Sequence, residues 1–221
     1  MRRRLVGHER WRRRLAGTAA GFAGLLACAP RARPLVGAPA PEVALPNAAL
    51  PAGARRVVFR WRYDEAEGFS ARGEGVARVV APDSGRLDFF LDGGLGGGWA
   101  LLIGDQITAP GGGMVQRLIP PPPLMWAALG RLAIPAAGDT TVRVAADTLR
   151  ADVGRDPTWR VTFIGPRLAR VERIDGGRVV EWVQRDSGVV RYRHEAGRRE
   201  LAIEVQRTEV VDAFPASIWL R

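Results

Sequence analysis

Residues 56–63 read Arg-Val-Val-Phe-Arg-Trp-Arg-Tyr, and this stretch decides the fold class. Val57, Phe59, Trp61 and Tyr63 occupy alternate positions, whereas three arginines and Val58 fall on the other face. Successive side chains of a β-strand point to opposite faces. The alternation therefore predicts a strand with one buried face and one solvated face.

Short runs of the same kind continue to residue 211, separated by turns rich in Gly, Asp and Pro. The connections are too short to contain crossover helices, so they predict an antiparallel meander and not parallel βαβ units. We expect strands at residues 73–81, 86–91, 99–103, 106–109, 114–118, 140–146, 148–153, 159–164, 168–174, 178–185, 189–194 and 199–211.

One segment departs from this rhythm. Four consecutive prolines, residues 120–123, precede residues 124–132, which favour a helix that is apolar nearly all round. Prolines suit the first turn of a helix, and a helix without a polar face needs cover on most sides. The predicted fold is mainly β: a strongly curved antiparallel sheet, or open half-barrel, with this short helix as a plug or lid on its concave side. A polyproline ligand for an SH3-like partner is the competing interpretation of the prolines.

The N-terminus has the pattern of an export signal. Residues 1–14 carry seven arginines against one acid, and residues 15–27 are uncharged. A bilayer span needs about 20 apolar residues, so this run fits the core of a signal peptide instead. The run ends Leu25-Leu26-Ala27-Cys28, which resembles the lipobox of bacterial lipoproteins. We expect a lipoprotein signal peptide over residues 1–27 and lipidation of Cys28, the only cysteine; a free cysteine after an ordinary secretion signal is the alternative.

The rest of the chain divides into two parts. Residues 28–54 combine the lipidated cysteine with a segment rich in Pro and Ala, which predicts a semi-extended tether. Residues 55–221 form the β domain. Ala29, which is not acidic, follows Cys28. By the lipoprotein sorting rule, this favours a lipid-anchored protein of the cell envelope, in the outer membrane and facing the periplasm.

The charge of the chain does not indicate nucleic-acid binding. The formal net charge is +10, but residues 1–27 hold +6 of it, and the remaining arginines are spread along alternating strand faces. All 33 basic residues are arginine, which excludes a Walker phosphate loop and lysine-based covalent catalysis. We expect no nucleic-acid partner.

The sequence offers little for catalysis. Beyond the signal, His194 is the only histidine; its neighbours Arg191 and Arg193 indicate a solvated strand face. No second histidine or cysteine completes a zinc site or a nucleophile dyad. Acids such as Asp83 and Asp175 are expected in turns anyway. We therefore predict no enzyme activity, no catalytic residues, no metal and no cofactor.

Residues 93–98 form a glycine cluster interrupted by Leu95. The spacing does not match a dinucleotide fingerprint, and a strand follows instead of a helix. A leucine at the tip of a glycine-rich loop is an exposed apolar probe suited to contact with a membrane. A Leu95 that folds inward is the alternative interpretation, and composition does not decide between the two.

Two longer stretches resemble a known family. Residues 87–96 (Leu-Asp-Phe-Phe-Leu-Asp-Gly-Gly-Leu-Gly) and 119–130 (Ile-Pro-Pro-Pro-Pro-Leu-Met-Trp-Ala-Ala-Leu-Gly) are similar to the leucine-projecting loop and proline-led helix of LolA/LolB-like lipoprotein-sorting proteins. The resemblance implies a curved sheet closed by helices around an apolar cavity, and a monomer that receives acyl chains of lipoproteins or lipids, in exchange with a periplasmic carrier protein. It makes Leu95 the residue that probes the membrane. It also gives candidate cavity residues, for each of which ordinary core is the alternative: Val57, Phe59, Trp61, Phe89, Leu91, Trp126 and Leu129.

The resulting expectation is a membrane-anchored lipoprotein that binds acyl chains and helps to deliver or insert lipoproteins or lipids, without enzymatic chemistry. The alternative is an envelope lipoprotein of structural role, which holds a protein or peptidoglycan partner and fills the hollow of its sheet with its own side chains.

Overall fold

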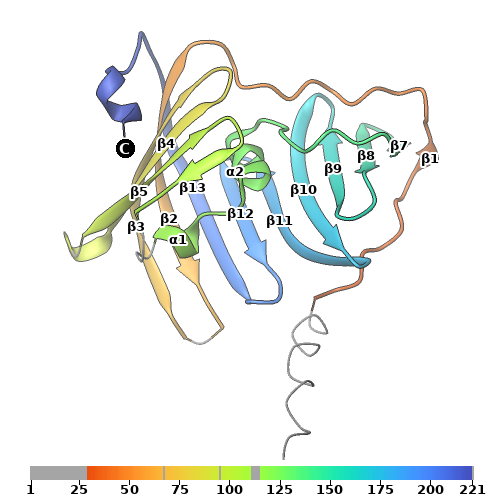
Figure 1. Ribbon diagram of the computed structural model, residues 1–221, viewed down its shortest axis with the longest axis horizontal. Helices are drawn as coiled ribbons and strands as arrows, with labels where there is room; N and C mark the ends of the chain where they lie inside the picture. Colours follow the sequence, from red (N-terminus) through yellow and green to blue (C-terminus); the bar gives the residue numbers. More distant parts are fainter. Residues whose placement is uncertain (1–28, 67, 95, 111–114, 221) are drawn as a thin grey trace, which may run out of the picture.

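The computed structural model describes residues 29–66, 68–94, 96–110 and 115–220, so the predicted signal peptide and Cys28 lie outside the described residues. The described chain forms one antiparallel sheet of thirteen strands (Figure 1). Their order is β1-β7-β8-β9-β10-β11-β12-β13-β2-β3-β4-β5-β6. The bounds are β1 Ala38–Pro39, β2 Ala54–Asp64, β3 Ser70–Val80, β4 Ser84–Leu91, β5 Gly97–Ile103, β6 Gln106–Thr108, β7 Thr140–Ala145, β8 Thr148–Val153, β9 Thr158–Ile164, β10 Arg167–Asp175, β11 Arg178–Asp186, β12 Val189–His194 and β13 Arg199–Val211.

The sheet consists of two meanders joined in the middle. Strands β7 to β13 follow one another, as do β2 to β6, and β13 pairs with β2 along the whole of β2. The two ends of the order, β1 and β6, do not pair with each other, so the sheet stays open. The predicted mainly β, open antiparallel fold is confirmed.

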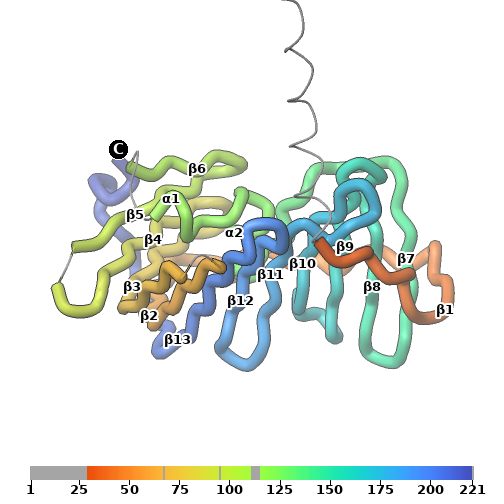
Figure 2. The backbone as a smooth tube through the Cα atoms, turned by 90° about the horizontal axis from the view of Figure 1, so that it is seen from below, coloured from red at the N-terminus to blue at the C-terminus, as the bar shows by residue number. Residues whose placement is uncertain are grey.

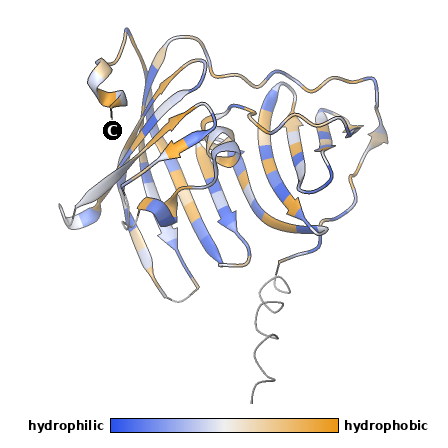
Figure 3. Cartoon of the chain, in the orientation of Figure 1, coloured by the Kyte–Doolittle hydropathy of each residue, from blue (hydrophilic) through white to orange (hydrophobic). Residues whose placement is uncertain are grey.

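The alternation that predicted β2 separates its two faces as expected. Phe59, Trp61 and Tyr63 are buried, whereas Arg60 and Arg62 are exposed. Most other strands show the same two-residue change between hydrophobic and hydrophilic side chains along the ribbon (Figure 3). The apolar face of the sheet is therefore continuous across both meanders.

One predicted strand is wrong. Residues 114–118 do not extend the sheet: Val115–Leu118 is a short helix, α1, and Met114 lies outside the described residues. Val115 and Leu118 are both buried, and their spacing of three residues fits one helical turn. A short apolar run does not distinguish a strand from a helix by periodicity alone.

The proline-led helix, α2, spans Pro122–Leu129 and is shifted toward the N-terminus relative to the predicted 124–132. Two prolines fit its first turn, where backbone N–H groups have no helical partner. The helix ends because Gly130 adopts a left-handed conformation with φ 98°, in which its N–H donates to the Ala127 carbonyl.

Helix α2 lies in the hollow of the curved sheet (Figure 2). It packs against β10, β11 and β12 on one side, and Leu129 reaches Gly85 of β4 on the other. Leu124, Met125, Trp126 and Ala127 are all buried. Neither helix of the described chain is long and apolar enough to cross a membrane.

Residues 29–53, the N-terminal strap, are extended but docked onto the domain. The backbone of Arg31 forms an isolated antiparallel β-bridge with that of Arg178, and β1 pairs with the edge strand β7. Farther along, the Ala48 carbonyl accepts a bond from the Leu132 N–H at 2.8 Å, and Leu50 is buried. Over these residues the strap is part of the fold and not a free spacer.

The close packing of the Phe59 ring on β3 predicts a test. A methyl group at Gly75 would lie 2.3 Å from the Phe59 ring, so Gly75→Ala should lower the free energy of unfolding by about 1–3 kcal/mol. A methyl group at Gly138 would have no neighbour within 4 Å, and Gly138→Ala should change the free energy of unfolding by less than about 1 kcal/mol. Urea unfolding monitored by circular dichroism measures both. Equal effects of the two substitutions would contradict this account of β3.

Candidate functional site

The concave face carries a layer of aromatic side chains. The Phe59 and Phe89 rings lie edge to face with centroids 5.6 Å apart, and Trp61 and Phe89 do the same at 5.8 Å. The register of the sheet explains this layer: β3 places Gly75 between Phe59 of β2 and Phe89 of β4. Because Gly75 has no side chain, the Phe59 ring occupies the space in which a Cβ at this position would lie.

Helix α2 belongs to the same hydrophobic cluster as this layer, and a few polar contacts hold the helix. The Trp126 indole N–H donates to the Gly104 carbonyl at 2.6 Å, and the Arg131 guanidinium lies over the Trp126 ring at 4.8 Å. Arg185 of β11 donates to the Ala128 carbonyl at the C-terminal end of the helix, where a cation is favourable. All other contacts of the helix body are apolar packing, since its residues 124–127 are apolar and buried.

The seven predicted cavity residues come together in one hydrophobic cluster. Four of them are buried, and Val57, Leu91 and Leu129 are partly buried against it. The buried four are Phe59, Trp61, Phe89 and Trp126. Side chains pack the hollow into this one cluster, and of the seven Trp61 also borders a surface groove. The two remaining predicted site residues, Cys28 and Leu95, lie outside the described residues.

Sequence reasoning missed several residues of the same cluster. They share full burial and lie on β5, α1 and α2. The three-residue spacing of Val115 and Leu118 was the available signal for α1, whereas nothing local marks Gly104 or Arg185 as partners of α2. Examples on these three elements are Leu102, Leu118, Leu124 and Met125.

A polar cluster lies at one end of β10 to β12. Glu181 is 2% exposed and accepts bonds from the Tyr192 hydroxyl at 2.9 Å and from Arg173 Nε at 2.6 Å. Burial, and next the charge of Glu181, raise the pKa of Tyr192, so its hydroxyl remains a donor. The arrangement satisfies a buried carboxylate and needs no ligand to do so.

His194 is not on the face predicted for it. His194 lies on the same face of β12 as Tyr192, opposite Arg191 and Arg193, and it is half-buried. Its Nδ1 accepts a bond from the Gly197 N–H at 3.0 Å, and burial lowers its pKa. It therefore holds a turn as a neutral imidazole. Within the described residues, no three His, Cys, Asp or Glu side chains are placed to hold a metal ion.

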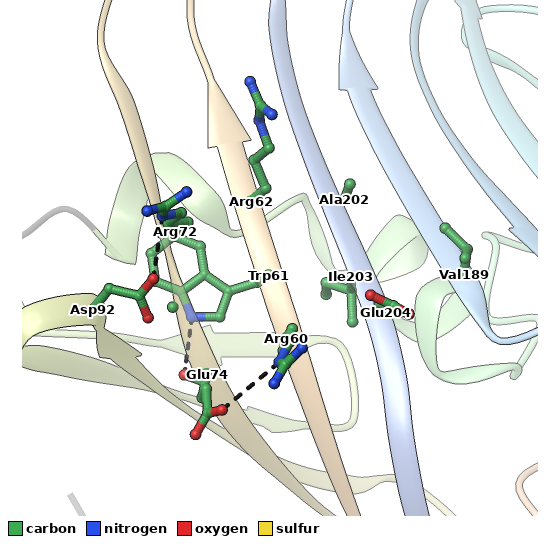
Figure 4. A pocket seen from close by; sticks show the side chains of 11 residues that line it. Arg60, Trp61, Arg62, Arg72, Glu74, Asp92, Val189, Ala202, Ile203 and Glu204 are labelled. Carbon is green, nitrogen blue, oxygen red and sulfur yellow. Dashed lines mark hydrogen bonds and ion pairs between the residues drawn. The ribbon is translucent and has the colours of Figure 1, made fainter.

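The convex face has a groove over β2, β3 and β13, which we call the paired groove (Figure 4). Each of its three arginines has an acid partner. The separations are 3.8 Å for Arg60–Glu74, 2.7 Å for Arg62–Asp64 and 3.2 Å for Arg72–Asp92. These exposed pairs balance the local charge, and each contributes little to stability.

An open antiparallel sheet curved around a short apolar helix is the class of fold that this chain shares with a solved LolA superfamily protein, and the predicted resemblance is confirmed at the level of the fold. A LolA superfamily protein from Nitrosomonas europaea matches with a TM-score of 0.50 at 11% identity, over 79% of this chain and 93% of that one.

Two further solved structures are similar at lower scores. A domain described as an outer membrane lipoprotein-sorting protein from Vibrio parahaemolyticus has a TM-score of 0.45 at 6% identity, over 76% of this chain and 89% of its own. A DUF1329 family protein from Desulfovibrio piger has a TM-score of 0.47 at 6% identity, over 76% of this chain and 90% of its own. No protein-family model and no curated protein matches the sequence.

The attachment of α2 predicts a local effect of Trp126→Phe. Phenylalanine keeps an aromatic ring at this buried position but is smaller than the indole and has no N–H, and the loss of the donor to the Gly104 carbonyl alone costs about 1–3 kcal/mol. Hydrogen exchange should become faster for the amides of α2 before it changes in β2. Trp219→Phe is the matched control, since Trp219 lies on the C-terminal tail and its one described ring contact, with Phe214, would be kept. Unchanged exchange in α2 would show that this bond does not hold the helix.

Proposed function

We propose that this protein is a non-enzymatic, membrane-anchored receptor or carrier that shelters acyl chains on the concave face of its sheet and delivers or inserts lipoproteins or lipids in the cell envelope. The observation that carries the proposal is the continuous apolar concave face, covered by one short apolar helix with few polar ties. The fold likeness to a LolA superfamily protein supports it.

The physical need for such a protein is large. Three acyl chains together contain roughly 40 methylene groups. At about 0.8 kcal/mol for each methylene, their exposure to water costs about 30 kcal/mol. Spontaneous transfer through an aqueous compartment is therefore negligible. An apolar surface in the carrier removes most of this barrier without covalent chemistry.

Helix α2 is the element that would make room. If it leaves the hollow, the seven cavity candidates become available to acyl chains, which replace apolar contacts with apolar contacts. The polar groups released are few: the Trp126 indole, the Ala128 carbonyl and Arg185, all of which can be solvated at the rim. The exchange thus costs less than the exposure of an empty hollow to water.

The N-terminal strap supports anchoring close to the membrane. Ala29 is 2% exposed, and its carbonyl accepts a bond from Arg178 at 2.7 Å. If Cys28 is lipidated, the acyl anchor is adjacent to the folded domain, with no free spacer between them. We place the protein in the outer membrane, facing the periplasm, where a periplasmic carrier protein hands over its cargo.

Uptake of a dansyl-labelled undecanoic acid tests the proposal. The full chain carrying Cys28→Ser, which removes the predicted anchor, should bind the probe with a rise in dansyl fluorescence. Leu91→Ser should weaken binding by about tenfold, because a partly buried apolar side chain on the concave face is lost. The adjacent Phe90 is 53% exposed on the other face, so Phe90→Ser should leave binding unchanged. Absence of probe binding, or equal effects of both variants, would reject the concave face as the lipid site.

Leu95 provides a separate prediction that rests on the sequence. Leu95→Asp should impair transfer of a lipidated cargo to phospholipid vesicles, since a charged tip does not enter an apolar layer. The temperature of unfolding and probe uptake should stay the same. Transfer at the unchanged rate would remove Leu95 from the proposed mechanism.

A second candidate function follows from the filled hollow. With the aromatic layer and α2 closely packed, the domain can also act as an envelope scaffold that holds a protein or peptidoglycan partner. This candidate predicts a stable partner in crosslinked envelopes and no uptake of the fatty-acid probe.

A further inference from the structure

A second groove of the convex face lies between the N-terminal strap and strands β8 to β11, and we call it the arginine groove. Its volume is about 570 Å³. Strap residues 33–36 form one wall, which is attached where Arg160 Nη1 donates to the Arg33 carbonyl at 2.6 Å. The floor consists of side chains on the face opposite the buried core, such as Thr162 between Val161 and Phe163.

The lining of this groove is strongly cationic. Only two acids, Glu172 and Asp186, face an excess of arginines contributed by the strap and by four neighbouring strands. The arginines are Arg33, Arg150, Arg160, Arg167, Arg170 and Arg185.

Two of these arginines are neutralised within the fold. Arg160 makes two bonds to the Asp152 carboxylate, at 2.7 and 2.8 Å. Arg170 pairs with Glu172 at 2.9 Å and stacks on the Trp182 ring at 4.1 Å. Their charges are already balanced, so they shape the groove more than they attract a ligand.

The other four have no acid partner in the described part of the chain: Arg33, Arg150, Arg167 and Arg185. Burial, and next the charge of Arg167, lower the pKa of Arg185. Arg185 is already bound to the Ala128 carbonyl at the end of α2, so Arg33, Arg150 and Arg167 are the lining cations left for an anionic ligand.

The paired groove on the same face is an internal comparison. It is of similar size, at about 490 Å³, and its three arginines each have an acid partner. The two grooves of this face therefore differ in how their arginines are paired. The arginine groove brings several arginines without an acid partner into one lining.

We propose that the arginine groove binds the phosphate of an anionic lipid head group and docks this face of the domain on a membrane surface. Guanidinium groups match phosphate oxygens in paired hydrogen bonds. Two lining residues are apolar and exposed, Val36 at 67% and Ile164 at 40%. Apolar side chains next to unpaired arginines fit the boundary between acyl chains and head groups.

The position of the groove along the chain agrees with this occupant. Val36 lies eight residues after Cys28. The strap that would begin at the predicted acyl anchor therefore also forms a wall of the groove. Anchor and groove can thus contact one membrane surface together.

Vesicle sedimentation tests the proposal with the full chain carrying Cys28→Ser. Vesicles of phosphatidylcholine alone are compared with vesicles in which phosphatidylglycerol replaces roughly one third of it. Binding to the anionic vesicles should fall about thirtyfold in Arg150→Gln/Arg167→Gln, at about 1 kcal/mol for each arginine near an anionic surface. The matched control is Arg60→Gln/Arg72→Gln, which removes the same charge from the paired groove and should change binding less than about threefold.

Equal losses in the two double variants would assign binding to net charge and overturn the proposal, as would no loss in either. Displacement of the protein from the vesicles by millimolar inorganic phosphate would assign the site to a free anion instead of a head group. Binding to an acidic protein segment with no preference for anionic vesicles would likewise overturn it. Dansyl-undecanoic acid uptake should be unchanged in Arg150→Gln/Arg167→Gln, so this inference and the acyl-chain proposal can fail separately.

Discussion

The pairing of β13 with β2 is the contact on which the rest of the structure depends. It joins strands that are far apart in the sequence and turns two meanders into one sheet. Helix α2 contacts both meanders: it packs against β10 to β12 on one side, and Leu129 packs against Gly85 of β4 on the other. Without the β13–β2 pairing, each half would expose an apolar face, and α2 would be covered on one side only. A hollow suited to apolar ligands is thus a consequence of joining the two halves.

Strand positions could be predicted from the sequence because alternation is local, but strand order could not. Nothing in residues 54–64 or 199–211 specifies that they pair, since each presents the same two-faced pattern to any partner. Residues 114–118 were predicted as a strand because five residues, two of them polar, are too few to show whether the period is that of a strand or a helix. The seven cavity candidates gather in one cluster because those on β2 and β4 share one face of the sheet and the other two lie on α2. The polar ties of α2 were missed, since backbone carbonyls such as those of Gly104 and Ala128 have no sequence signature.

The strap was misjudged for a related reason. A segment rich in Pro and Ala has no periodicity, which ordinarily indicates a segment without fixed partners. In this protein its partners are backbone groups at the edge of the sheet: β1 covers the edge of β7, and the Gly177 carbonyl accepts a bond from Ala32. Such contacts tolerate many sequences, so only the sheet itself shows that they exist. The arginine groove was invisible for the same reason, because one of its walls is this strap.

The docked strap also determines how mechanical force enters the domain. A pull on the N-terminal end, as from an anchor in a fluid membrane, first reaches the contact of Arg31 with Arg178 at the start of β11 and then the short β1–β7 pairing. These contacts are few and can open one after another. Strand β2 and its long pairing with β13 lie behind them in the chain. Under load the strap can therefore peel away from the sheet and lengthen the chain ahead of β2 while the hollow of the sheet stays folded.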